Sequence, residues 1–82
     1  MRPEQVADLI RRSLTDAAVD VRSGDDVHFT ARVVSGAFAG KRPLQRHQLV
    51  YRALGDLMGG EIHALSIEAL TPEEAAGSGK TG

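Results

Sequence analysis

The chain has 82 residues, no cysteine and a formal net charge of −1. A chain of this length supports a single compact core, and the lack of thiols excludes disulfides and any metal site made only of thiolates. The near-zero charge gives no overall attraction to nucleic acid. Because no long apolar segment occurs, we expect neither a membrane-spanning helix nor a signal peptide, and the cytoplasm is the expected location.

The first half of the chain predicts a helix and a hairpin. After an early proline, apolar residues recur at spacings of three and four, which predicts an amphipathic helix over residues 3–15. Residues 19–22 are a strand candidate, and residues 23–26 have the composition of a turn in which Gly24 takes a positive φ. Apolar and polar residues alternate over residues 27–33, which predicts a half-buried strand that pairs with the first one.

The second half predicts another helix and a third strand. Residues 36–41 form a loop or short helical turn, and Pro43 then suits a helix start. The apolar stripe of this helix comprises His47, Val50, Tyr51, Leu54, Leu57 and Met58. Gly59-Gly60 is expected to end the helix in a left-handed conformation. Residues 62–70 are rich in β-branched and aliphatic residues, and one face of the predicted strand carries His63, Leu65, Ile67 and Ala69.

This order of elements predicts an α+β fold, a three-stranded sheet with helices packed on one face. We place the domain over residues 1–72. Residues 73–82 are small, polar and rich in glycine, so we expect a disordered C-terminal tail. A short helical turn over residues 72–76 is the alternative for the start of this tail.

The chain has three histidines, and each has a structural as well as a functional interpretation. His28 is expected on the polar face of its strand, His47 on the apolar stripe of its helix, and His63 at the start of the last strand. A half-buried structural role explains His47 without any ligand role. Two histidines cannot hold a metal tightly without further ligands, so another molecule would have to supply the rest. No serine lies in a catalytic motif, and we do not expect an enzyme.

A basic segment lies between Arg32 and Arg52, where there are five basic residues and no acidic one. A solvated helix face explains this pattern, and a docking patch for an acidic protein or for nucleic-acid phosphates is the functional alternative. The candidate contact residues are Lys41, Arg42, Arg46, His47 and Arg52.

Several blocks of this sequence, spread over residues 4–74, closely resemble the BolA family. They are Phe38-Ala39-Gly40-Lys41-Arg42-Pro43-Leu44-Gln45-Arg46-His47-Gln48-Leu49-Val50-Tyr51, then Ile62-His63-Ala64-Leu65-Ser66-Ile67, with His28-Phe29, Val33-Val34-Ser35 and Thr71-Pro72-Glu73. The resemblance implies the αββααβ arrangement of that family, which is similar to class II KH domains. The Gly-x-x-Gly loop of KH domains is absent, because Gly36 and Gly40 are separated by three residues.

The resemblance also implies a partner and a cofactor. BolA-like proteins pair with monothiol glutaredoxins and share a [2Fe–2S] cluster, with thiolates from glutaredoxin and glutathione and a histidine from the BolA side. His63 matches that ligand, and His28 is the nearest candidate for a second one, whose identity stays open. No cofactor is expected in the isolated chain, which we expect to be a monomer or weak homodimer.

The same family includes proteins described as DNA-binding transcriptional regulators. The alternative function is therefore DNA binding through the basic helix over residues 42–52. A third possibility is a stress-linked interaction module that binds its partner without a cofactor.

Overall fold

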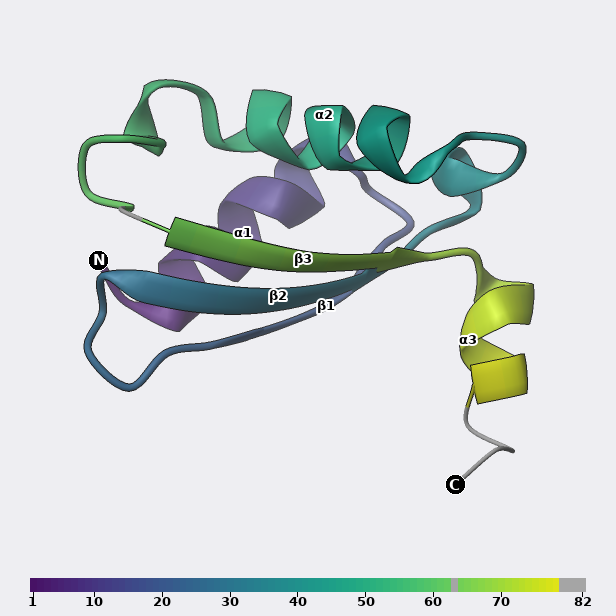
Figure 1. The fold of residues 1–82 in the computed structure, drawn as a ribbon, viewed down its shortest axis with the longest axis horizontal. Coiled ribbons are helices and arrows are strands. Elements are labelled where there is room, and N and C mark those ends of the chain that lie inside the picture. Colours follow the sequence, from purple (N-terminus) through teal and green to yellow (C-terminus); the bar gives the residue numbers. More distant parts are fainter. Residues whose placement is uncertain (63, 79–82) are drawn as a thin grey trace.

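The computed structural model describes residues 1–62 and 64–78. Three helices and three strands make up the fold, with a short 3₁₀ turn on either side of the second helix (Figure 1). The elements in chain order are α1 (Pro3–Ser13), β1 (Ala18–Arg22), β2 (His28–Val34), η1 (Gly36–Phe38), α2 (Pro43–Leu54), η2 (Gly55–Leu57), β3 (Ala64–Leu70) and α3 (Pro72–Ser78). No helix in this described part is long and apolar enough to cross a membrane.

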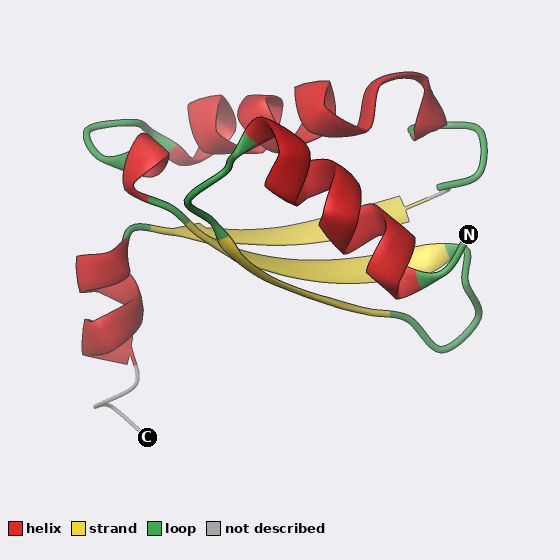
Figure 2. Ribbon diagram, turned by 180° about the vertical axis from the view of Figure 1, so that it is seen from behind, coloured by secondary structure: helices red, strands yellow, loops and turns green. Residues whose placement is uncertain are grey.

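The sheet is mixed, with strand order β1-β2-β3. β1 pairs antiparallel with β2, as expected for a hairpin, and β3 pairs parallel with β2 after the helical crossover. Figure 2 shows α1 and α2 on the same side of the three strands, while α3 follows β3 at one end of the sheet. The expected α+β fold with helices on one face is confirmed.

Alternating burial along β2 explains why only one face of the sheet is covered. Phe29, Ala31 and Val33 are buried, and the residues between them are exposed. On β3, Leu65, Ile67 and Ala69 pack partly buried against the same core. Successive side chains of a strand point to opposite faces, so the predicted alternation is confirmed. His63, which was expected to share the core face of β3, lies outside the described residues.

The turn between β1 and β2 differs from the expectation in one backbone angle. Asp26 has a φ of 59° and is the only non-glycine residue with positive φ in the described part of the chain. Gly24 was expected to take that role and does not. Aspartate tolerates the left-handed region because its short side chain can hydrogen-bond locally, so the turn does not depend on glycine there.

The second helix ends earlier than predicted. α2 stops at Leu54, and Gly55 follows with φ 57° and ψ −129°. Residues 55–57 then form η2, and Gly59, which was expected to end the helix, has a φ of 85° in the loop beyond. Tyr51 was predicted to lie on the apolar stripe of this helix, but it is 39% exposed. Val50 and Leu54 are buried as expected.

The C-terminal segment starts with a helix, in agreement with the alternative given for residues 72–76 and not with a tail disordered from residue 73. α3 runs from Pro72 to Ser78, so residues 73–78 continue the domain as a helix. Thr71 and Glu74 bond each other at the helix start, with the Thr71 N–H donating to Glu74 Oε1 (2.9 Å) and the Glu74 N–H donating to Thr71 Oγ1 (3.2 Å). This is a capping box, which satisfies two backbone donors that the helix itself leaves unpaired. Residues 79–82 of the expected tail lie outside the described part.

Candidate metal-ligand site and partner surface

The loop before β2 holds His28 in place through side-chain to backbone hydrogen bonds. Asp25 Oδ1 accepts from the backbone N–H of Val27 (3.0 Å) and of His28 (2.8 Å). The Ser23 hydroxyl donates to the carbonyl oxygen of His28 (2.6 Å) and accepts from the Asp26 N–H (2.9 Å). Such bonds give aspartate and serine their preference for turns, and here they fix the residue that opens the strand.

Asp25 also contacts the imidazole ring. Its Oδ2 lies 2.7 Å from His28 Nδ1, and the two side chains are 53% and 67% exposed. The hydrogen bonds from the His28 backbone and ring, followed by that from Val27, hold the pKa of Asp25 well below its usual range. The carboxylate therefore stays ionised at neutral pH and faces one nitrogen of an exposed imidazole.

His28 lies next to the start of β3. In the parallel register His28 pairs with Ala64, the residue that follows His63 in the chain. His63, the first predicted ligand, lies outside the described residues. Within the described part, no three histidine or carboxylate side chains are grouped closely enough to hold a metal ion. The described residues at this end of the sheet therefore do not form a complete metal site by themselves.

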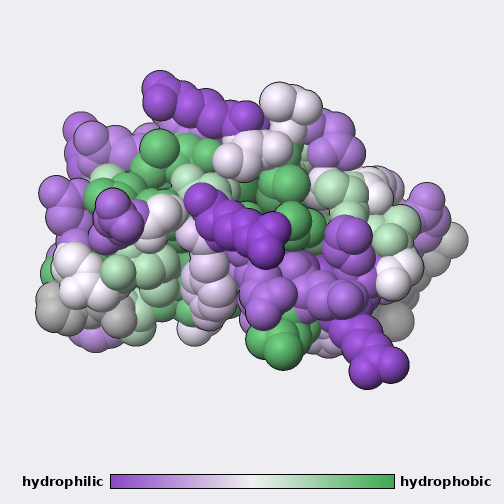
Figure 3. Space-filling model, turned by 90° about the horizontal axis from the view of Figure 1, so that it is seen from above, coloured by the Kyte–Doolittle hydropathy of each residue, from purple (hydrophilic) through white to green (hydrophobic). Residues whose placement is uncertain are grey.

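The predicted contact residues on α2 divide into two kinds. Lys41, Arg42 and Arg52 are exposed. Lys41 and Arg52 border a shallow hollow of about 170 Å³, which is completed by Gln45, Gln48 and Leu49. Figure 3, which views the molecule from the α2 side, shows hydrophilic side chains spread over this face with hydrophobic surface between them.

Arg46 is of the other kind, because its guanidinium is held inside the molecule. Its side chain is 12% exposed. It donates to the carbonyl oxygens of Lys41 (2.9 Å) and Ala69 (3.0 Å) and to both carboxylate oxygens of Glu74 (2.6 and 3.2 Å). The hydrogen bond to Glu74 raises the pKa of Arg46. This geometry gives Arg46 a structural role that joins α2, β3 and α3. The exposed basic residues of the predicted contact surface are then Lys41, Arg42 and Arg52.

Comparison with known proteins places the chain in a family. A family model described as BolA-like protein matches residues 3–74. The chain belongs to the BolA-like family.

Three relatives illustrate the similarity of this BolA-like chain. BolA-like protein 1 of Homo sapiens is 50% identical over 54 residues, which are 66% of this chain and 39% of the human protein. The DNA-binding transcriptional regulator BolA of Vibrio cholerae is 46% identical over 55 residues, 67% of this chain and 52% of that protein. The solved structure of a bolA protein homologue from Coxiella burnetii has a TM-score of 0.82 at 38% identity, and the match covers 93% of this chain and 97% of that one.

These matches confirm the resemblance to the BolA family that the sequence blocks indicated. The match to the human protein spans about two fifths of its length, so only a BolA-like module is shared with it. These two relatives are named as a BolA-like protein and a transcriptional regulator and not as enzymes.

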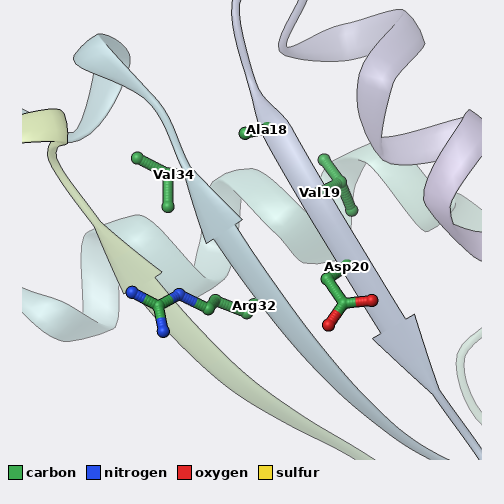
Figure 4. Close-up of a pocket in the computed structure, with 5 residues that line it drawn as sticks. All are labelled: Ala18, Val19, Asp20, Arg32 and Val34. Atoms are coloured by element: carbon green, nitrogen blue, oxygen red, sulfur yellow. The ribbon is translucent and has the colours of Figure 1, made fainter. Parts of the chain in front are cut away.

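Two further features of this BolA-like module are the position of His47 and a second hollow. His47 is half-buried on α2, and its position does not decide between the structural and the contact role. A hollow of about 240 Å³ lies over β1 and β2, lined by Ala18, Val19, Asp20, Arg32 and Val34 (Figure 4). By register it is at the Val34 end of β2, away from His28, and it is not part of the candidate ligand site.

Sequence reasoning missed Asp25 as a site residue. An aspartate three residues before a histidine can bond both its backbone and its ring, but this spacing alone does not fix where the ring lies. Turn propensity accounted for the Asp25-Asp26 pair by itself, so the contact with the imidazole was not sought.

Proposed function

We propose that this BolA-like module pairs with a monothiol glutaredoxin and shares a [2Fe–2S] cluster with it, in iron–sulfur trafficking or in iron and redox regulation. His63 and His28 are the ligand candidates of this chain, and glutaredoxin and glutathione supply the thiolates. The observation that carries the proposal is the exposed His28 ring, whose Nδ1 faces the Asp25 carboxylate beside the start of β3.

The donor set of this chain fits a shared cluster and does not fit one held alone. The chain has no cysteine, and its described residues contain no group of three ligands. Iron–sulfur clusters are held mainly by thiolates, and histidine in place of thiolate raises the reduction potential. The chemistry that a bound cluster would supply is electron transfer or transfer of the cluster itself, and the part of this chain is to present imidazole nitrogens.

Visible circular dichroism tests the proposal. A cluster-loaded monothiol glutaredoxin is titrated with the wild-type chain, with His63→Ala and with His28→Ala. We expect the wild-type chain to change the cluster spectrum and His63→Ala to abolish that change. Arg12→Ala, an exposed position on α1, is the control and should behave as wild type. An unchanged spectrum on mixing, or an equal change with His63→Ala, would refute the proposal.

A DNA-binding regulator is the second candidate. It is favoured by the exposed basic residues Lys41, Arg42 and Arg52 in a segment that lacks acidic residues, and by the regulator name of the Vibrio cholerae relative. The logarithm of the affinity falls with the logarithm of the salt concentration, with a slope of about −0.9 for each phosphate contact. Three contacts therefore predict a slope of about −2.7.

A fluorescence anisotropy titration of duplex DNA at several salt concentrations tests this candidate. Arg42→Glu and Arg52→Glu should weaken binding and reduce the salt slope. No binding at low salt, or binding that is unaffected by both substitutions, would refute the DNA-binding function.

A further inference from the structure

The Asp25 carboxylate is more firmly placed than its exposure alone would indicate. Oδ1 accepts from the backbone N–H groups of Val27 and His28, and the Ser23 hydroxyl lies 3.2 Å from the same oxygen. These contacts orient the carboxylate so that Oδ2 is directed at the imidazole, 2.7 Å from Nδ1. The position of Oδ2 is thus set by the loop backbone and not by the imidazole alone.

This contact determines which nitrogen of the ring carries the proton. An ionised carboxylate is only an acceptor, so the nitrogen that faces it has to be the donor. In the neutral ring Nδ1 is then protonated, and Nε2 carries the lone pair. Among the described residues Nε2 has no hydrogen-bond partner, and the side chain is mostly exposed.

We propose that Asp25 is a positioning residue that fixes the ring and the tautomer of His28, so that Nε2 is the atom presented to a metal. The inference rests on the proposed function for the identity of the metal centre, but the contact itself does not. Metal-ligating histidines usually donate their other ring N–H to a carboxylate or carbonyl, and removing that partner typically costs about 10–100-fold in metal affinity.

The neighbouring Asp26 provides a matched control. It carries the same charge in the same loop, but the contacts of the described residues to the His28 ring come from Asp25. Asp26→Asn keeps a residue that tolerates the positive φ of 59° at this position. Any effect of charge alone should therefore appear in both variants, and an effect of the ring contact only in Asp25→Asn.

The first measurement uses the metal-free chain and long-range ¹⁵N–¹H correlation spectra at about pH 8.5, where an unperturbed imidazole is neutral. We expect His28 of the wild type and of Asp26→Asn to be protonated at Nδ1. Asp25→Asn should lose this preference, because an amide can also donate to Nδ1. A wild-type ring protonated at Nε2, or an unchanged tautomer in Asp25→Asn, would overturn the proposal.

The second measurement titrates the same chains with Zn²⁺ alone. The ¹⁵N shift of His28 should move at Nε2 in the wild type, and Asp25→Asn should bind about tenfold more weakly. Equal affinity of Asp25→Asn and Asp26→Asn, or binding through Nδ1, would overturn the positioning role. Asp25→Glu keeps an acceptor and should recover part of the affinity.

The visible circular dichroism of the cluster then distinguishes failure of this inference from failure of the proposed function. If the wild-type chain leaves the glutaredoxin spectrum unchanged, the proposed function fails, while the tautomer and Zn²⁺ results still decide the role of Asp25. If the wild-type chain changes the glutaredoxin spectrum and the His28→Ala and Asp25→Asn chains change it just as much, His28 is not a ligand and the positioning role is refuted.

Discussion

Phe38 is fully buried although it lies in a three-residue 3₁₀ turn between β2 and α2. The Ser35 hydroxyl accepts from the Ala37 N–H (3.1 Å) and donates to Asp16 (2.7 Å). These bonds fix the turn, and the turn directs the ring into the core. Phe38 also belongs to one of the blocks that resemble the BolA family, and its burial gives it a packing role there.

Phe38→Ala should lower the free energy of unfolding by about 3–5 kcal/mol, because removing a buried aromatic ring loses transfer free energy and leaves a cavity. Leu44 is 68% exposed, and Leu44→Ala should change stability by less than about 0.5 kcal/mol. Urea unfolding followed by far-ultraviolet circular dichroism measures both. Equal losses in the two variants would contradict the core described here.

Asp25 shows, at the same scale, why part of the site was not predictable. Its place in a Ser-Gly-Asp-Asp sequence fully explains an aspartate by turn propensity. The contact with His28 depends on the ring position, which no local pattern encodes.

At the scale of the element, α2 illustrates both the success and the limit of periodicity. Pro43 and the spacing of Val50 and Leu54 predicted the helix correctly. Leu57 and Met58 continue the apolar pattern, so the pattern did not show that the helix ends before Gly55. Both remain partly buried against the core after the helix has given way to a 3₁₀ turn, so burial continued while the backbone conformation changed.

Gly55→Ala should destabilise the fold by about 1–3 kcal/mol, because φ 57° and ψ −129° lie in a region that side chains with a Cβ atom rarely adopt. No heavy atom is near enough to obstruct the new Cβ, so the loss would come from the backbone. Gly24 has no positive φ and an open environment, and Gly24→Ala is the control. A thermal or urea unfolding series in which both variants match wild type would show that the helix end does not require glycine.

The C-terminal helix was predicted only as an alternative, a short helical turn over residues 72–76, and the contact that anchors it concerns the whole molecule. Its sequence is polar and rich in small residues, which by itself indicates disorder. The ion pair between Arg46 and Glu74 joins residues 28 positions apart, and pairs so distant leave no local pattern. Predictions of the sheet and its covering helices succeeded because they depended on local periodicity alone.

The ion pair between Arg46 and Glu74 should make the stability of the whole molecule depend on pH in the acid range. The bonds from Arg46 and from the Thr71 backbone lower the pKa of Glu74 from 4.5 to about 2. Hydrogen bonds also lower the pKa of Asp16, chiefly from Ser35, and of Asp25, chiefly from the His28 backbone. Carboxylates with depressed pKa stabilise the fold above their unfolded values, and this stability is lost as the pH falls through their folded values.

The urea midpoint of the wild type should therefore fall between about pH 5 and pH 2. Glu74→Gln should begin with a lower midpoint at pH 7 and lose less on acidification. Glu73→Gln, which alters an exposed neighbour on α3, should follow the wild-type curve. An identical pH dependence in Glu74→Gln and wild type would show that the ion pair does not contribute to stability.

The central claim is that this chain supplies histidine nitrogen to a cluster shared with glutaredoxin. The most direct measurement labels only this chain with ¹⁵N-histidine, assembles it with a cluster-loaded monothiol glutaredoxin, reduces the cluster and records pulsed electron paramagnetic resonance. We predict ¹⁵N couplings of directly coordinated imidazole, which weaken in the complex formed with His63→Ala and disappear when His28 is replaced as well. A reduced cluster without ¹⁵N coupling to any histidine of this chain would contradict the proposed function.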